Sequence, residues 1–345
     1  MEQPKQQLYL PAEWHDQQMV QLTWPHEGTD WHYMLDEVEA CYIELAKAIS
    51  QRERLLIVAP DVNKVTSALK KNGVSTANIT LFECETNDTW ARDHGFITLL
   101  GSNVPHYVDF CFNGWGRKFE AALDNAINGK LYDAGVVMGE YEDCTSFVLE
   151  GGSIESDGKG TILTTSQCLL APHRNQPMEK AEIERCLLNM LHAERVLWLD
   201  YGNLIGDDTD GHVDTVARLA PSDTIVYMQC TDKDEEQYAD LRAMEKQIAE
   251  LRTAAGEPYR MLALPSPTAI YDEDGERLPA TYANFLVMNG AVLYPIYAQP
   301  ENDRRAAEVL AVAFPGREIV GIDCRALIRQ HGSLHCVTMQ FPKGR

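Results

Sequence analysis

Four segments of the chain carry acids, a histidine or a cysteine in loops that are marked by glycine. They cover residues 87–95, 149–155, 206–214 and 331–338. Each lies where a strand-like run ends, and sites on α/β scaffolds are commonly built there. Any one of them could be an ordinary turn, because Asp and Gly cluster in turns. Together they supply a thiol and a separate acid/base group, which suits nucleophilic catalysis.

Cys336 is the candidate nucleophile. The nine cysteines are scattered, their number is odd and no C-x-x-C pair occurs, so the sequence indicates neither a zinc site nor a disulfide framework. Most of them are expected to be small buried hydrophobic residues. Composition alone does not separate Cys336 from the others, but its flanks do, because it follows His335 in a polar, glycine-marked loop.

The segment 206–214 allows two kinds of ligand. If it is extended, Asp208, Asp210, His212 and Asp214 share one face, because side chains alternate along a strand. Three carboxylates and an imidazole on one face could bind a metal ion or a planar organic cation. The Gly and Glu positions of an EF-hand loop are absent. Both alternatives stay open from the residues alone.

The composition is that of an acidic globular protein. The chain has 345 residues, 45% of them hydrophobic, and a net charge of −22. Nucleic acids and anionic membranes bind basic patches, so both are unsuited as partners, whereas a small cationic substrate would be attracted. No apolar run approaches the roughly 20 residues of a membrane span, and residues 1–6 lack the apolar core of a signal peptide. We expect a cytoplasmic protein, with a homodimer or homotetramer possible.

The elements that must position these loops recur in a fixed order. Strands are expected at 55–59, 79–84, 96–100, 107–110, 136–138, 160–165, 196–199, 214–219, 224–229, 259–264, 284–288, 291–294 and 318–322, and helices at 61–71, 118–134, 178–192, 234–253 and 302–313. This order gives roughly five strand–strand–helix–strand units, which usually stack or close into a ring. No linker divides them, so one domain over residues 1–345 is predicted. A doubly wound sheet is the competitor, but its G-x-G-x-x-G fingerprint is absent.

Seven motifs carry a resemblance to a known family. They are T-W-P at 23–25, N-D-T-W-A-R-D at 87–93, F-N-G-W-G at 112–116, L-E-G-G-S at 149–153, D-T-D-G-H-V-D at 208–214, Y-A-N-F at 282–285 and G-S-L-H-C at 332–336. In this order they resemble the agmatine deiminase family, which includes the Porphyromonas-type peptidylarginine deiminases. The resemblance covers nearly the whole chain.

The resemblance implies a fold and a reaction. The fold is the pentein fold, a closed five-bladed pseudo-symmetric α/β propeller of ββαβ modules with the site on its axis. The reaction is agmatine plus water giving N-carbamoylputrescine and ammonia through a covalent thiouronium, without a metal or organic cofactor. Polyamine biosynthesis by way of putrescine is the process that this product would serve.

The resemblance also implies roles for residues. Cys336 is the nucleophile and His212 the general acid and then the base, Asp93 and Asp214 hold the guanidinium, and Glu150 contacts the substrate or orients His212. Trp90, Trp115 and Asp208, with Asp88 and Thr209, are the candidate residues for the rest of the substrate.

The sequence indicates the guanidinium group of the substrate more clearly than the part of the substrate beyond it. Asp208 stands where agmatine-specific members carry Glu, the segment 94–96 reads H-G-F where T-G-P is commoner, and 332–334 reads G-S-L where G-G-N is commoner. Peptidylarginine or another alkylguanidine is therefore an alternative substrate. A module that only binds guanidinium or a metal is the alternative from another class, although binding alone would need neither Cys336 nor His212.

Overall fold

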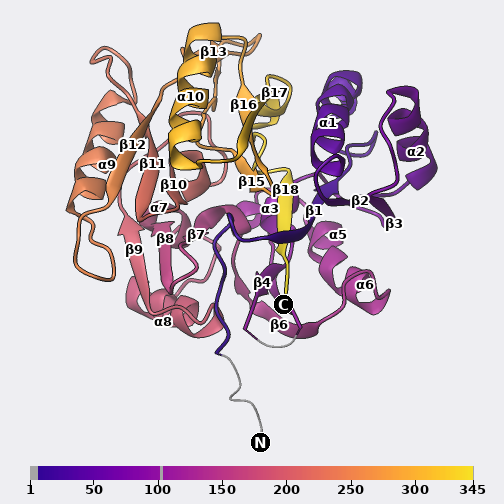
Figure 1. Cartoon of the computed structure of the whole chain (residues 1–345), viewed down its shortest axis with the longest axis horizontal. Coiled ribbons are helices and arrows are strands. Elements are labelled where there is room, and N and C mark those ends of the chain that lie inside the picture. Colours follow the sequence, from indigo (N-terminus) through magenta and orange to yellow (C-terminus); the bar gives the residue numbers. More distant parts are fainter. Residues whose placement is uncertain (1–6, 102–103, 345) are drawn as a thin grey trace, which may run out of the picture.

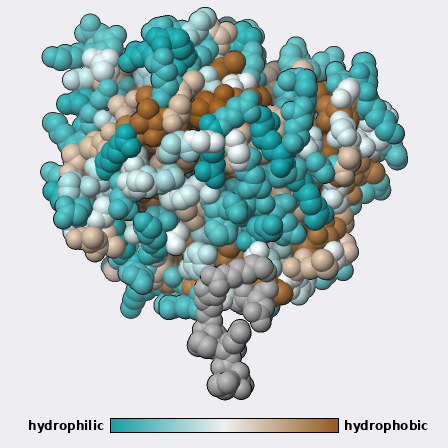
Figure 2. Space-filling model, viewed as in Figure 1, coloured by the Kyte–Doolittle hydropathy of each residue, from teal (hydrophilic) through white to brown (hydrophobic). Residues whose placement is uncertain are grey.

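Most of the strands gather into five sheets of three or four strands that surround the centre of the molecule, with the longer helices outside them (Figure 1). The computed structural model describes residues 7–101 and 104–344. On the face shown in Figure 2 the surface is mainly hydrophilic, with smaller hydrophobic patches. This surface agrees with the strongly acidic composition.

Each sheet contains an antiparallel pair followed by a parallel strand. The first sheet has an additional strand and consists of β18 (Thr338–Pro342), β1 (Gln17–Thr23), β2 (Arg54–Ala59) and β3 (Ile79–Glu83). The second sheet consists of β4 (Ile97–Leu99), β5 (His106–Cys111) and β6 (Glu140–Val148), and the third of β7 (Ile154–Ser156), β8 (Thr161–Thr165) and β9 (Arg195–Leu199). The fourth sheet consists of β10 (Ala217–Ala220), β11 (Thr224–Gln229) and β12 (Arg260–Pro265), and the fifth of β15 (Leu286–Met288), β16 (Ala291–Ile296) and β17 (Glu318–Asp323). A small hairpin pairs β13 (Ile270–Tyr271) with β14 (Arg277–Leu278).

The long helices connect the strands, and short helices lie at the strand ends. The longer ones are α1 (Leu35–Ser50), α2 (Val62–Lys71), α6 (Ile127–Asp133), α8 (Lys180–Met190), α9 (Tyr238–Glu250) and α10 (Pro300–Ala313). The short ones are α3 (Ala91–His94), α4 (Gly114–Arg117), α5 (Ala122–Asn125) and α7 (Ser166–Leu169), with 3₁₀ turns η1 (His32–Met34), η2 (Gly151–Ser153), η3 (Val213–Thr215) and η4 (Leu327–Gln330). Of these, η2 packs against both α3 and η3.

The predicted mixed α/β class is confirmed, and the five sheets match the predicted number of units. Asp61 caps α2, because its carboxylate accepts hydrogen bonds from the backbone N–H groups of Asn63 and Lys64. Among the described residues the five sheets remain separate and do not join into one closed sheet. The strand pairing therefore shows separate sheets and does not show the predicted closed propeller.

Two local predictions are wrong. The strand expected at 136–138 is a turn, in which Gly135 has a φ of 69° and Met138 is 79% exposed, and β6 begins only at Glu140. The helix expected at 118–134 is divided into α5 and α6, with Ala126 between them. A short run of apolar residues is an ambiguous signal, since a turn between a helix and a strand can carry the same pattern.

No helix among residues 7–101 and 104–344 has the length and apolar character needed to cross a membrane.

Candidate active site

Four segments that connect different sheets carry the five predicted catalytic side chains. Asp93 lies in α3, Glu150 directly precedes η2, His212 directly precedes η3, Asp214 lies in η3 and Cys336 lies between η4 and β18. The backbone N–H of Arg92 donates to the carbonyl of Cys336 at 3.1 Å. This bond ties the Asp93 segment to the candidate nucleophile.

Gly152 marks the point where three of these side chains converge. A Cβ at this position would lie 2.6 Å from Nδ1 of His212, 3.0 Å from an oxygen of Asp93 and 3.1 Å from an oxygen of Asp214. Any side chain here would collide with the imidazole. The L-E-G-G motif thus supplies both the acid at 150 and the space that lets the other groups meet.

Asp93 is held at both carboxylate oxygens. One accepts a hydrogen bond from the backbone N–H of Gly152 at 3.0 Å, and the other accepts from the indole of Trp115 at 2.9 Å. Burial, together with the negative charges of Asp214 and Glu150, raises the pKa of Asp93 well above its usual range. A cation bound between these acids would counter that shift.

Asp214 remains ionised despite its burial. Burial opposes its charge, but a 2.7 Å hydrogen bond with Nδ1 of His335 and the nearby charge of Arg218 bring the pKa of Asp214 below its usual value. Its other oxygen has no hydrogen-bond partner among the described residues. An ionised carboxylate therefore presents one free oxygen to the site.

His212 is completely buried, and neither ring nitrogen has a hydrogen-bond partner among the described residues. Its Nδ1 lies 3.6 Å from Asp93, and its Nε2 lies 4.0 Å from Glu150. Burial lowers the pKa of His212 to about 3, so the imidazole is neutral near pH 7. It is thus free to accept a proton between two acids.

Cys336 is 5% exposed. Its thiol lies 3.3 Å from the side-chain oxygen of Asn284, which also accepts the backbone N–H of His335 at 2.8 Å. Burial and the charges of Asp214 and Asp93 raise the pKa of the Cys336 thiol well above its usual value. The raised pKa favours the protonated thiol near pH 7.

Arg174 and Asn284 belong to the site, but neither was a predicted site residue. Arg174 donates to Glu150 at 2.9 Å, to Asp210 at 2.6 Å and to the carbonyl of Thr209 at 2.9 Å. It follows α7 as an isolated arginine, so the sequence carried no signal for this role. Asn284 stood in the Y-A-N-F motif, which was the available signal.

The predicted substrate-tail residues line one pocket above Cys336. Its lining comprises Asp30, Asp88, Trp90, Asp93, Trp115, Phe119, Asp208, Thr209, Gln330, His331, Gly332 and Cys336, and its empty volume of about 430 Å³ includes open solvent. Trp115 has a φ of 53° between two glycines of positive φ, a strained turn that brings its indole to Asp93. Seven of the ten predicted site residues thus line the pocket, and the other three, His212, Glu150 and Asp214, lie near Asp93.

The expected extended face at 208–214 is wrong. Asp210 and Gly211 have φ values of 66° and 94°, so the chain turns and the side chains separate. Asp210 binds Lys118 and Arg174, whereas Asp208 lines the pocket. The hydroxyl of Thr209 accepts the backbone N–H of His212 at 3.0 Å, which fixes the histidine. A metal site made of these four side chains does not form.

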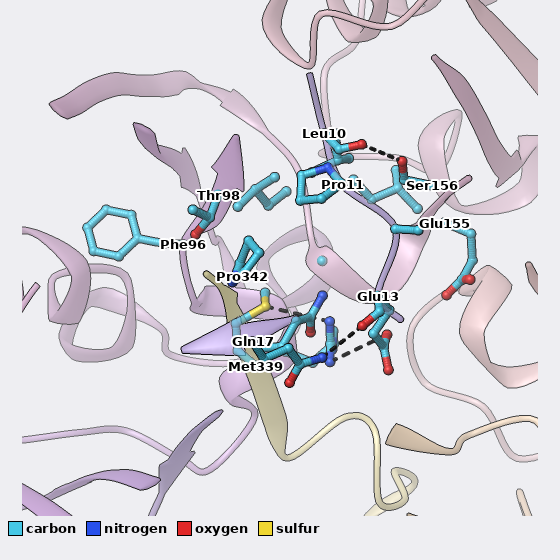
Figure 3. A pocket seen from close by; sticks show the side chains of 16 residues that line it. Leu10, Pro11, Glu13, Gln17, Phe96, Thr98, Glu155, Ser156, Met339 and Pro342 are labelled. Atoms are coloured by element: carbon cyan, nitrogen blue, oxygen red, sulfur yellow. Dashed lines mark hydrogen bonds and ion pairs between the residues drawn. The ribbon is translucent and has the colours of Figure 1, made fainter. Parts of the chain in front are cut away.

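A second cavity backs the loop that holds Asp93 (Figure 3). Arg92 and Gly151 line it, and they are the chain neighbours of Asp93 and Gly152. Buried polar atoms of Gln17, Arg92, Thr98 and Gln340 lack hydrogen-bond partners among the described residues there. Unpartnered polar atoms thus lie behind the loop of Asp93, in a cavity that apolar residues such as Phe96 and Met339 also line.

Comparison with known proteins places the whole chain in one family. The sequence model of the Porphyromonas-type peptidyl-arginine deiminases matches residues 9–342. A Legionella pneumophila (strain Paris) protein provisionally named an agmatine deiminase is 34% identical over 99% of this chain and 97% of its own.

Solved structures give the same result. A Porphyromonas gingivalis protein provisionally named an arginine deiminase is 50% identical with a TM-score of 0.92, covering 98% of this chain and 99% of that one. A cysteine-to-serine variant of the C. jejuni agmatine deiminase, with substrate bound, is 36% identical with a TM-score of 0.90, covering 100% and 99%. A dimethylarginine dimethylaminohydrolase structure, 11% identical with a TM-score of 0.50 and covering 94% of this chain and 100% of that one, is similar in fold alone. The chain therefore belongs to the Porphyromonas-type peptidyl-arginine deiminase family and is an enzyme, a hydrolase of carbon–nitrogen bonds of the agmatine deiminase kind.

Proposed function

We propose that this enzyme hydrolyses agmatine to N-carbamoylputrescine and ammonia, with Cys336 as the nucleophile. One observation carries the proposal. Three buried acceptors have no partners among the described residues: one oxygen of Asp214, one of Glu150 and, in the neutral ring, one of the two unpartnered nitrogens of His212. A guanidinium is planar, cationic and rich in N–H donors, so it would satisfy them.

The chemistry follows from the protonation states of these groups. Bound guanidinium brings a positive charge beside Cys336, and the thiol proton passes to neutral His212. The thiolate attacks the guanidinium carbon to form a carbon–sulfur bond and a tetrahedral adduct. The imidazolium returns the proton to one nitrogen, which leaves as ammonia, and the thiouronium remains. Acid/base transfer of this kind is typically worth about 10²–10⁴-fold in rate.

The second half of the reaction uses the same histidine. Neutral His212 takes a proton from water, and the hydroxide attacks the thiouronium carbon. The carbon–sulfur bond then breaks, the hydroxyl proton of the adduct leaves to solvent, and the imidazolium protonates the departing thiolate, which leaves the ureido product and restores the thiol and neutral His212. Glu150, 4.0 Å from Nε2 of His212, stabilises the imidazolium in both halves because its charge is opposite.

The pocket chemistry supports agmatine over free arginine. Asp30, Asp88 and Asp208 lie among the lining residues, and no Arg or Lys is found among those that the structure describes there. An ammonium tail would meet these acids and the faces of two tryptophans, which stabilise alkylammonium groups by about 0.5–2 kcal/mol. A free carboxylate would find no cation.

The decisive experiment compares agmatine, free arginine and a blocked arginyl peptide. Ammonia release and product mass are measured for each, with Cys336→Ser as the inactive control and Cys144→Ser as the matched buried cysteine. Agmatine should be turned over best. Preference for the peptide would favour peptidylarginine instead, and retained turnover in Cys336→Ser would contradict the mechanism.

The five units are further proposed to form the closed pseudo-symmetric propeller of the pentein fold. Their arrangement around the centre (Figure 1) and the similarity in fold to the dimethylarginine dimethylaminohydrolase support this.

A further inference from the structure

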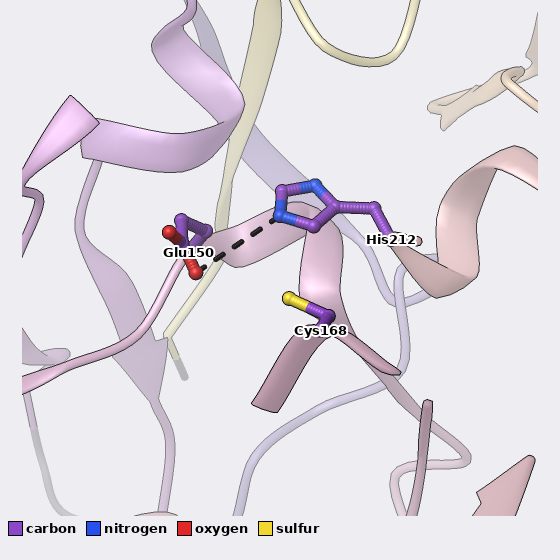
Figure 4. Close-up of side chains that lie close together, drawn as sticks. All are labelled: Glu150, Cys168 and His212. Carbon is purple, nitrogen blue, oxygen red and sulfur yellow. Dashed lines mark ion pairs between the residues drawn. The ribbon is translucent and has the colours of Figure 1, made fainter. Parts of the chain in front are cut away.

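A second cysteine lies beside the catalytic histidine and takes no part in the proposed reaction. The thiol of Cys168, one oxygen of Glu150 and one ring nitrogen of His212 all lie within 4.8 Å of one another (Figure 4). All three residues have relative exposures of zero. The free atoms of Glu150 and His212 have no hydrogen-bond partner among the described residues.

The surrounding backbone holds these donors together. Cys168 lies in α7, whose N-cap is Thr165. The hydroxyl of Thr165 accepts the backbone N–H of Cys168 at 3.3 Å and donates to the carbonyl of Gly211 at 2.5 Å. Gly211 directly precedes His212, so one side chain sets the positions of the thiol and the imidazole. The third donor is also fixed, because Arg174 binds the other oxygen of Glu150 at 2.9 Å.

We infer that Glu150, Cys168 and His212 form a binding site for a zinc-class divalent cation that inhibits the enzyme. One sulfur, one nitrogen and one oxygen donor, with a fourth position left open, are a set that Zn²⁺ accepts. Tetrahedral coordination at zinc bond lengths requires donors about 3.5 Å apart, so the three side chains need to close by about 1 Å. Mg²⁺ and Ca²⁺ prefer oxygen ligands throughout and are not suited to this set.

Binding proceeds with loss of the thiol proton. The cation forms a bond to the Cys168 sulfur, and the S–H proton leaves to solvent. The thiolate and the Glu150 carboxylate balance the two charges of the ion, and Asp210, 2.6 Å from Arg174, offsets the positive charge of that residue. The ion then occupies His212 and Glu150, which the proposed reaction needs for proton transfer and for the guanidinium. Inhibition would therefore be competitive with the guanidinium substrate.

The binding test does not depend on the proposed reaction. Full-length, tag-free Cys336→Ser protein is titrated with Cd²⁺ by calorimetry and with Co²⁺ by absorption, since a thiolate bound to Co²⁺ gives a charge-transfer band. In this background the nucleophile cannot supply a thiolate. We expect one equivalent to bind with the thiolate band. Adding Cys168→Ala should remove the band and weaken binding at least about 10-fold, while adding Cys144→Ala should change neither.

The inhibition test uses the active enzyme. Zn²⁺ should inhibit ammonia release by wild type and Cys144→Ala alike, and the inhibition constant should rise at least about 10-fold in Cys168→Ala. Mg²⁺ should not inhibit. Equal Cd²⁺ affinity and an equal thiolate band with and without Cys168 would overturn the inference, as would equal Zn²⁺ inhibition of wild type and Cys168→Ala. If no guanidine were turned over at all, the proposed function would fail while the binding result would still decide the metal site.

Discussion

Nδ1 of His335 lies 2.7 Å from a carboxylate oxygen of Asp214, so the residue before the candidate nucleophile Cys336 holds one of the acids of the candidate site. The other ring nitrogen lies 2.7 Å from Glu13. The histidine therefore connects Asp214, in the candidate site, to Glu13 on the other side of the ring. It is a positioning residue, because it acts on the substrate only through Asp214.

Replacing this histidine tests that role. His335→Gln should lower kcat about 10- to 100-fold with a smaller change in KM, since a misplaced acid costs orientation more than binding. Steady-state kinetics with agmatine, with thermal unfolding measured alongside, check the result. His32→Gln, in the exposed η1 turn, is the control. A raised KM at unchanged kcat would contradict the positioning role.

The protonation state of Cys336 should depend on the substrate cation. Near pH 7 the thiol should be unionised in the free enzyme, because its burial and two nearby acids raise its pKa. Addition of guanidinium should produce a thiolate absorbance in wild type that Cys336→Ser lacks and Cys144→Ser retains. If guanidinium adds no more thiolate absorbance to wild type than to Cys336→Ser, the cation does not assist ionisation of the Cys336 thiol.

Gly152→Ala should abolish activity. The added methyl would lie 2.6 Å from Nδ1 of His212, and a displacement of about 1 Å can cost roughly 100-fold in rate. Gly129→Ala in α6 is the matched control, since its Cβ would meet nothing within 4 Å. Ammonia release by the two variants is compared, and equal activity would show that the three side chains do not need this space.

Asp208 should contribute to substrate affinity. Asp208→Asn should raise KM for agmatine about 2- to 5-fold at nearly unchanged kcat, because an exposed charge pair is worth up to about 1 kcal/mol. The exposed Asp234→Asn is the control. A fall in kcat with unchanged KM would place Asp208 in the chemistry instead of the pocket wall.

Asp88 should make the affinity for a cationic substrate depend on pH. Burial raises the pKa of Asp88 to about 7, against the opposing hydrogen bond from Trp90. The carboxylate therefore gains its charge as pH rises through about 7, and kcat/KM for agmatine should rise with it. Asp88→Asn should remove that component. A kcat/KM profile that is identical in wild type and variant would exclude Asp88 as its source.

The same shift predicts an effect on stability. The pKa of Asp88 in the folded protein is above the ordinary value of 3.8. Its contribution to the free energy of unfolding is therefore fully present below about pH 4 and is lost as pH rises to about 7. The loss is at most about 4 kcal/mol. Urea unfolding of wild type and Asp88→Asn at pH 4.5 and 8 measures it. If the free energy of unfolding falls no more between pH 4.5 and 8 in wild type than in Asp88→Asn, the raised pKa of Asp88 is contradicted.

Much of the fold could be predicted because its signals are local. The apolar run at 55–59 and the amphipathic segment after Asp61 occur close together in sequence, and both elements form as expected. At 136–138 the same kind of run forms a turn instead, because Gly135 takes a left-handed conformation and the chain must reverse before β6.

The site was predictable only in part. Cys336 and His212 stand in motifs, and the structure places both of them near Asp93 and Asp214. Arg174 carried no local signal, because its partners Glu150 and Asp210 lie 24 and 36 positions away. Cys168 was expected to be a buried hydrophobic residue, and it is buried, but its approach to His212 depends on how α7 packs. The periodicity of apolar residues predicts which face of a helix or strand is buried, whereas these contacts form between separate elements.

The pairing of β18 with β1 has a consequence for biosynthesis. One edge of β1 can be completed only by residues 338–342, and Cys336 is made just before them. At translation rates of about 5–20 residues per second, this edge stays unpaired for roughly 15–60 s. A nascent chain thus cannot complete the candidate site, to which Cys336 belongs, until nearly all of these residues have been polymerised.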